Sequence, residues 1–466
     1  MGDCTSGKTA ALGRVVVNFL TLVAFWIVFS QLDFLGLESA TKERAADLVA
    51  TARTPFYGFF DRDNARPQDA IAVVLITDAS VRQFERPYPL PFSQHERLLS
   101  VIARSDPAAI FVDLRFTYLR GGDKVEQLLA PLQDAPHIPT LFAAGRQGDR
   151  FPDDLGLLAD HGAIVAWDAD EGTYPLTFSG GDRSVAFDLF SRLCLAGAPA
   201  YFCPTNRGGL PDYRAPMALQ WGMRVARDQD RIWNVDTCPL ADGRDGFWAR
   251  LWQATKRLVP ALIPGSGLDW DAGARCFYHL TIPAERLTDP DVAALLKGRV
   301  VFYGAMVEGI PDLATVPVLG RVPGVAVHAM AFDNLLADGT SYVEAAPGSG
   351  LGRRMLFALE PIAWLGIAAI IAWRRPAGAP PIWQVLLRYP GTWFRQLAAA
   401  FRHAGPGRAS WPNLDIPFFV LLLIALFVVN ELWLRIEVTS WLGLGLLYLF
   451  AREAAVHAKS DSSPSP

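Results

Sequence analysis

Short apolar runs alternate with amphipathic segments through the middle of the chain, from about residue 70 to residue 340. Ile71–Ile76 is a continuous apolar run, which is typical of a parallel β-strand covered on both faces. Val325, Ala329 and Leu336 recur at helical spacing and mark one face of a helix. Strands that alternate with helices predict an α/β fold, with a largely parallel sheet between helical layers.

The same patterns predict the other elements of this region. A capping box at Ser93 and Glu96 predicts that a helix begins there, with Leu98 and Ile102 on its apolar side. Further strands are expected at 109–114, 138–143, 163–167 and 300–303, and further helices at 125–132 and 290–296. Between about residues 200 and 280 the alternation stops, and we interpret this stretch as an irregular insertion that either covers a pocket or has no role in binding.

Apolar runs on either side of this middle region predict transmembrane helices. The first lies at residues 15–35, and a cleaved signal peptide is the alternative, although no Ala-x-Ala cleavage site follows it. The others lie at residues 355–373, 416–434 and 438–451. Because the last run is short for a bilayer, three spans are the alternative to four.

Charge predicts which side of the membrane each segment occupies. Residues 374–413 hold six Arg and neither Asp nor Glu, and basic residues collect on cytoplasmic loops. Two basic residues place the N-terminus, residues 1–14, on the same side. Residues 36–350 are then extracytoplasmic, and residues 452–466 form a cytoplasmic tail.

Two features of the predicted membrane region carry alternative interpretations. The basic loop at 374–413 interleaves Arg with aromatic residues such as Trp383 and Trp393, which suits either an interfacial helix on anionic membrane lipids or the docking of a partner protein. Glu360 lies within the second predicted span, where an acid is either an intramembrane functional group or one that reaches the aqueous interface.

Composition adds two expectations. The net charge of −4 is mild, and we expect no nucleic-acid partner. Four cysteines fall in the predicted extracytoplasmic part, where disulfides form, and sequence spacing favours a 194–203 pair with a 238–276 pair. Four buried thiols are the alternative for these residues, which are Cys194, Cys203, Cys238 and Cys276.

Polar residues follow several of the predicted strands. In an open α/β sheet, ligands bind outside the carboxyl ends of the strands. Five candidates for such a ligand site are Asp78, Asp113, Arg115, Asp312 and His328. One interpretation is a pocket for a small polar ligand that is anionic or bound to a metal. The other is that the carboxylates cap loops and pair with Arg62 or Arg115.

An enzyme is a further alternative for the same residues, as an extracytoplasmic metal-dependent hydrolase. The sequence has no Gly-x-Ser-x-Gly, no His-Glu-x-x-His and no phosphate-binding loop, so we expect neither catalysis nor a cofactor nor a resident metal. The remaining histidines of this region are interpreted as surface or packing residues, and they are His95, His137, His161 and His279.

A series of motifs between Asp61 and Pro347 resembles the type 2 CHASE domain, an extracellular sensory module of bacterial cyclases, histidine kinases and serine/threonine kinases. The motifs occur in the same order as in that family, whereas residues 145 to 275 match poorly. The matching segments are 71–78 (IAVVLITD), 107–113 (PAAIFVD), 298–304 (GRVVFYG), 309–312 (GIPD) and 323–329 (PGVAVHA).

The resemblance implies an anchor before the sensor domain, usually three spans after it, and a place in a bacterial plasma membrane. Members commonly continue into a cytoplasmic cyclase or kinase, whereas this chain ends about 15 residues after its last predicted span. We therefore expect a separate effector protein to receive the signal. A structural or assembly subunit with no ligand of its own is the alternative, and oligomerisation stays open.

Overall fold

The computed structural model describes residues 54–57, 67–166, 173–196, 200–222, 224–233, 250, 277–309, 312–316 and 320–345. All of them belong to one compact unit, Asp47–Ala346. Among these described residues, no helix is both long enough and apolar enough to cross a membrane. The predicted spans, the basic loop, Glu360, Cys238 and Cys276 lie outside the described residues.

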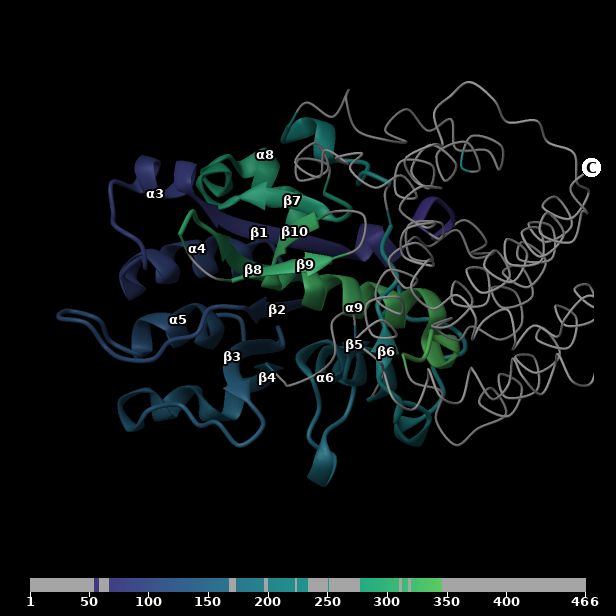
Figure 1. Ribbon diagram of the computed structural model, residues 1–466. Helices are drawn as coiled ribbons and strands as arrows, with labels where there is room; N and C mark the ends of the chain where they lie inside the picture. The colour runs from purple at the N-terminus through teal and green to yellow at the C-terminus, as the bar shows by residue number, and fades with distance from the viewer. Residues whose placement is uncertain are drawn as a thin grey trace, which may run out of the picture. The chain divides into compact units, whose positions relative to one another are not determined.

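The centre of the domain is a parallel sheet of six strands in the order β4-β3-β2-β8-β1-β7 (Figure 1). Apolar runs of the sequence form these strands, and nearly all residues of β1, β2, β7 and β8 are buried. The strands are β1 (Ile71–Thr77), β2 (Ala109–Val112), β3 (Thr140–Arg146), β4 (Gly162–Ala166), β7 (Leu280–Pro283) and β8 (Val300–Met306). The predicted α/β fold is confirmed.

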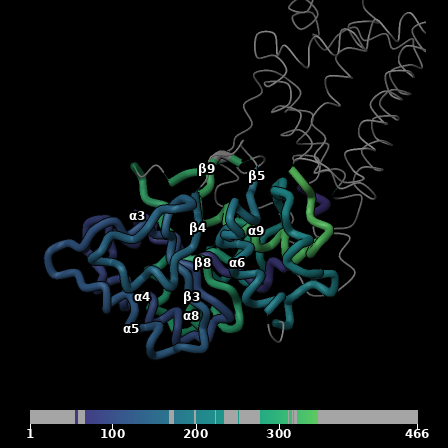
Figure 2. The backbone as a smooth tube through the Cα atoms, turned by 90° about the horizontal axis from the view of Figure 1, so that it is seen from below, coloured from purple at the N-terminus to yellow at the C-terminus, as the bar shows by residue number. Residues whose placement is uncertain are grey.

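One face of the sheet is covered by α3 (Asp78–Phe84), α4 (Phe92–Arg104), α5 (Glu126–Gln133) and α8 (Pro290–Ala293). The other face is covered by α6 (Val185–Phe190) and α9 (Gly324–Asp338). Each face forms its own apolar core, because successive side chains of a strand point to opposite sides. Figure 2, seen from below, separates α5 and α8 from α6 and α9.

The described residues also form smaller elements. Two antiparallel pairs are formed by β5 (Thr173–Tyr174) with β6 (Met217–Ala218) and by β9 (Leu313–Val316) with β10 (Gly320–Pro323). A disulfide joins Cys194 to Cys203, the pair that spacing favours. Short helical turns are η2 (Thr54–Phe56), η3 (Pro67–Ala70), η4 (Asp153–His161), η5 (Ser179–Gly181), η6 (Ser191–Leu195, a π-helix), η7 (Leu210–Asp212), η8 (Gln229–Arg231), η10 (Ala284–Thr288), η11 (Ala294–Leu296) and η12 (Gly339–Ser341).

The position of β8 shapes the carboxyl edge of the sheet. This strand lies between β1 and β2, although it follows them by about 200 residues in the chain. The helices that follow β1 and β2 cover one face, whereas α9, which follows β8, covers the other. The connections that follow two neighbouring strands move apart at the strand ends when they run to opposite faces of the sheet. Ligands bind at this position in open α/β sheets.

One predicted helix start is wrong. The helix α4 begins at Phe92 rather than after Ser93, and its N-cap is Pro91, which makes no side-chain capping bond. Proline already holds the φ angle at −68°, and the Phe92 amide donates to Asp123 Oδ1 at 2.9 Å. A carboxylate from another loop therefore satisfies the first turn, so the local capping box is not used.

Candidate functional site

Asp113 follows β2 directly and continues its ladder with β8. Its amide donates to the Tyr303 carbonyl oxygen at 2.7 Å. Strand alternation directs Phe111, two residues earlier, to the face that α9 covers, and the Asp113 side chain lies on that same side beside His328. Only 10% of this side chain is exposed.

His328 faces Asp113 from the second turn of α9. Its Nδ1 atom lies 2.9 Å from the hydroxyl of Tyr174, and the Phe111 ring packs edge-on against it at 5.5 Å between centroids. Burial lowers the pKa of His328 to about 3, so the imidazole is neutral at neutral pH. Its Nε2 atom lies 4.0 Å from Asp113 Oδ2, which is too far for a hydrogen bond.

Asp312 reaches the same edge because β9 pairs with β10, which places Leu313 opposite Pro323. The Gly324 amide donates to the Asp312 carbonyl oxygen at 3.1 Å and begins α9. The Asp312 carboxylate lies over Gly324, where a β-carbon would come within 2.6 Å of Oδ1. The residue as a whole is exposed, yet its carboxyl group is enclosed enough that partial burial raises its pKa.

The charge of Asp312 acts on the Asp113 carboxyl group. Burial, together with the negative charge of Asp312, raises the pKa of Asp113 from 3.8 to about 8. Burial also raises the pKa of Tyr88, the charges of Asp312 and Asp113 raise it further, and the charge of Arg120 lowers it. Among the described residues, no Lys or Arg lies within ion-pair distance of either carboxylate, and no hydrogen bond reaches the Asp113 carboxyl group. Asp113 is thus a buried acid next to a second acid and a neutral imidazole.

The structure does not join the other two predicted site residues to this group. Arg115 forms an ion pair with Asp149 at 3.1 Å, and 61% of its side chain is exposed. Asp78 accepts from the Glu308 amide at 3.3 Å, so it caps the loop after β8. In the described part of the chain, the strand-end cluster is therefore Asp113, Asp312 and His328. No three or more His, Cys, Asp or Glu residues of that part stand close enough to hold one metal ion.

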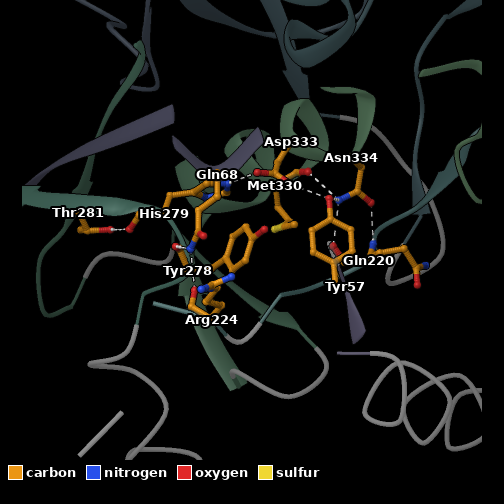
Figure 3. A network of polar contacts seen from close by, with 10 residues as sticks. All are labelled: Tyr57, Gln68, Gln220, Arg224, Tyr278, His279, Thr281, Met330, Asp333 and Asn334. Atoms are coloured by element: carbon orange, nitrogen blue, oxygen red, sulfur yellow. Dashed lines mark hydrogen bonds and ion pairs between the residues drawn. The ribbon is translucent and has the colours of Figure 1, made fainter. Parts of the chain in front are cut away.

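A second buried polar group surrounds Asp333, at the other end of α9 (Figure 3). Its Oδ1 atom accepts from the Tyr57 hydroxyl at 2.6 Å, and its Oδ2 atom lies 3.1 Å from His279 Nε2. The next residue, Asn334, donates to the Tyr57 hydroxyl at 2.9 Å and accepts from the Gln220 amide at 2.8 Å. Four separate segments of the chain meet here.

The side chains of Gln68 and Thr281 bond to backbone carbonyl groups and hold the segment before β7 beside this network, as Figure 3 shows. Gln68 Nε2 donates to the carbonyl oxygens of Tyr278 and Arg224, the latter at 2.7 Å. The Thr281 hydroxyl donates to the His279 carbonyl oxygen at 3.0 Å. These contacts fix the backbone on which the His279 ring is carried.

The sequence interpretation missed the Asp333 network. His279 is buried and paired, and no local motif indicates its partner, 54 positions later. One signal was present: Asp333 and Asn334 interrupt the apolar run of α9 and are fully buried. Two adjacent polar residues on a buried helix need partners, which makes them candidates for a network.

The remaining histidines differ in their surroundings. His95 is buried, its Nδ1 lies 2.8 Å from the Tyr303 hydroxyl, and burial lowers its pKa to about 4. His161 Nδ1 lies 3.2 Å from the Thr140 carbonyl oxygen. His137 is exposed beside Asp106. These environments agree with packing and surface positions.

Comparison with known proteins assigns the family. No curated protein and no solved structure matches the chain. The family model of the CHASE2 domain matches residues 20–373, which is more than half of the sequence and includes every described residue. The sheet and its strand-end cluster lie within the matched region. This chain belongs to the CHASE2 family, a family of sensory domains.

Proposed function

We propose that this chain is a multi-pass protein of a bacterial plasma membrane whose extracytoplasmic CHASE2 domain binds a small molecule at Asp113, Asp312 and His328. The observation that supports this most is the Asp113 carboxyl group, which is nine-tenths buried without a hydrogen bond from the described residues. Burying a carboxyl group without a hydrogen-bond partner costs roughly several kcal/mol. Buried carboxyl groups without partners are therefore retained where a ligand or a reaction uses them.

We propose that α9 transmits the binding of a ligand from the strand-end cluster to the Asp333 network. His328 lies at the ligand site, and Asp333 follows five residues later on the same helix, about 7–8 Å along its axis. A shift of α9 at His328 would therefore move the acceptor of the Tyr57 hydroxyl. The segment that carries Tyr57 follows the predicted first span, and α9 leads to the predicted second span.

We propose that a separate effector protein receives the signal. Membrane lipids are the other proposed contact of this chain, at its basic loop 374–413. Affinity purification of the full chain from native membranes in mild detergent, followed by mass spectrometry, tests this part. We expect a stoichiometric partner. Recovery of a monomer that has ligand-dependent activity of its own would contradict the proposal and favour the hydrolase alternative.

Membrane topology is tested with reporter fusions at residues 200, 405 and 466. Four spans predict an external reporter at 200 and cytoplasmic reporters at 405 and 466. An external signal at 405 would contradict the extracytoplasmic position of the sensor domain. An external signal at 466 alone would indicate three spans.

The ligand site is tested by a thermal-shift screen of the full chain in lipid nanodiscs. A ligand of the proposed site raises the melting temperature of the wild type but not that of Asp113→Asn. Asp149→Asn is the matched control, since Asp149 pairs with Arg115 outside the cluster. If every stabilising compound acts equally on Asp113→Asn, the ligand site is elsewhere; if none acts and a partner co-purifies, the assembly-subunit alternative is favoured.

A further inference from the structure

The chain leaves the described part of the domain through residues 339–345, which follow α9 and are called the exit segment below. The exit segment precedes the predicted span at 355–373. Its partners come from residues 206–218, within the stretch that the sequence predicts as an irregular insertion. Because more than a hundred positions separate the two segments, only the folded chain brings them together.

Asn206 holds the point where α9 ends and the exit segment begins. Its Nδ2 atom donates to the Asp338 carbonyl oxygen at 2.8 Å, and its own carbonyl oxygen accepts from the Thr340 amide at 3.1 Å. Gly339 has a φ angle of 52°, and a β-carbon there would lie 2.5 Å from Asn206 Oδ1. The glycine therefore allows Asn206 to approach the end of the helix, whose last carbonyl groups need partners.

The backbone of the exit segment then pairs with the end of the 206–218 segment. The Ala218 amide donates to the Val343 carbonyl oxygen at 2.8 Å, and the Ala345 amide donates to the Pro216 carbonyl oxygen at 2.9 Å. These two bonds run in opposite directions across one antiparallel pair. The exit segment is thus held as a strand rather than only by side chains.

An aromatic stack supports this pairing from the side of α6. The Tyr342 hydroxyl donates to the Ala215 carbonyl oxygen at 2.8 Å, and the Tyr342 ring stacks on Tyr213 with 5.9 Å between centroids. Tyr213 is fully buried and packs against Phe187 and Phe190 of α6, at 5.0 and 5.5 Å between centroids. The exit segment is therefore fixed to the core and not only to a surface loop.

Tyr174 connects the same pairing to the strand-end cluster. Its hydroxyl lies 2.9 Å from His328 Nδ1. Its backbone lies opposite Met217 in the β5–β6 pair, and Met217 also bridges to Glu344 of the exit segment. A residue in a strand pairs with two others only across its two edges, so β6 lies between β5 and the exit segment.

We propose that residues 206–218 are a clamp that sets where the exit segment leaves the domain, and that Tyr174 ties this clamp to the strand-end cluster. A displacement of His328 then reaches the exit segment across β5 and β6, without passing along α9. This inference goes beyond the proposed function, because the clamp holds the exit segment whether or not a small molecule binds.

Hydrogen–deuterium exchange of the full chain in nanodiscs, with no compound added, tests the clamp. Tyr342→Phe removes a donor within the clamp, and Tyr174→Phe removes the contact with His328. In each variant we expect peptides that cover 215–218 and 339–345 to exchange about fivefold faster, because one hydrogen bond is lost. Peptides from β1 and β8 should exchange as in the wild type, which distinguishes a loosened clamp from an unfolded domain.

Further variants control this comparison. Tyr201→Phe is the matched control, because 77% of Tyr201 is exposed, and it should leave exchange unchanged. Asn206→Ala removes the side-chain bond at the end of α9 and should also speed exchange of the exit segment. If Tyr174 and Tyr342 act on one clamp, the double variant should speed exchange by less than the product of the two single effects.

The outcomes separate the clamp from its link to the strand-end cluster. Faster exchange in Tyr342→Phe and Asn206→Ala but not in Tyr174→Phe, or independent effects in the double variant, would overturn the link. Exchange of the exit segment at the wild-type rate in all of these variants would overturn the clamp itself. An equal increase in β1 and β8 would also overturn it, since the exit segment would then open only with the whole domain.

Discussion

The Tyr57 hydroxyl donates a 2.6 Å hydrogen bond to Asp333, which lies 276 residues later in the chain. Tyr57 belongs to the first described segment of the domain, and Asp333 lies on its last long helix. The contact therefore ties the two ends of the sensory domain together through a buried carboxylate. Any movement of α9 acts directly on this bond.

Removal of the Tyr57 hydroxyl should destabilise the domain. Tyr57→Phe takes a donor from Asp333 and an acceptor from Asn334, both of which are fully buried. We expect the free energy of unfolding to fall by about 1–3 kcal/mol, measured by pulse proteolysis of the full chain. Tyr118→Phe is the matched control, because Tyr118 is 60% exposed, and it should change stability by less than about 0.5 kcal/mol. Equal effects of the two changes would contradict the structural role of the contact.

Asp113 should make stability depend on pH. Its pKa is raised in the folded state, so its stabilising contribution is complete below its ordinary pKa of 3.8 and is lost as the pH rises through about 8. His328 acts in the opposite sense at lower pH, because its pKa falls from 6.5 to about 3. The window from pH 6.5 to 8 therefore isolates Asp113 from His328.

In that window the wild type should lose about 1–2 kcal/mol of stability relative to Asp113→Asn, which has no titrating group at this position. Denaturant titrations of both proteins at several pH values measure the difference. Parallel pH profiles would show that Asp113 has an ordinary pKa, and that its carboxyl group is already satisfied.

Gly304 should be needed for the approach of α9 to the sheet. A β-carbon at this position of β8 would lie 2.7 Å from Cβ of Val325, which is fully buried in the first turn of α9. Gly304→Ala should therefore push α9 from β8 and cost about 1–3 kcal/mol. Gly156→Ala should be nearly neutral, since a β-carbon there meets no atom within 4 Å. A thermal melt of the two variants decides this, and an unaffected Gly304→Ala protein would mean that α9 shifts without cost.

The Cys194–Cys203 disulfide should stabilise η6, the π-helix that follows α6. Replacing both residues with Ala opens a short loop, since the two cysteines are separated by nine positions, and we expect a loss of about 2–3 kcal/mol. Added reductant should lower the melting temperature of the wild type to that of the double variant. Reductant that leaves the wild type unchanged would show that this bond contributes nothing to stability.

The sequence predicts the elements of the sheet better than their arrangement. Ile71–Ile76 is apolar throughout because β1 is covered on both faces, and such a run needs no tertiary information to be recognised. The place of β8 between β1 and β2 depends on the path of long connections, which leaves no local pattern. The start of α4 depends on Asp123 from a different loop.

The sequence likewise predicts some residues of the candidate site but not how they pair. Asp113 and His328 were predictable together, because parallel strands end at one edge and α9 begins there. Arg115 follows the same strand, yet it pairs with Asp149, and the sequence does not reveal which partner it takes. The pairing of His279 with Asp333 arises only when the residue before β7 meets α9 in the folded chain, so no spacing rule could have indicated it.

Hydrogen–deuterium exchange tests most directly whether the ligand site and the Tyr57 contact are coupled through α9. The full chain in nanodiscs is compared with and without a saturating compound from the thermal-shift screen, one that raises the melting temperature of the wild type but not that of Asp113→Asn. Both proteins are measured. We expect slower exchange in wild type across residues 324–338 and also in the segment that contains Tyr57, and no change in Asp113→Asn. Slower exchange confined to the residues around Asp113, with the Tyr57 segment unchanged, would contradict it.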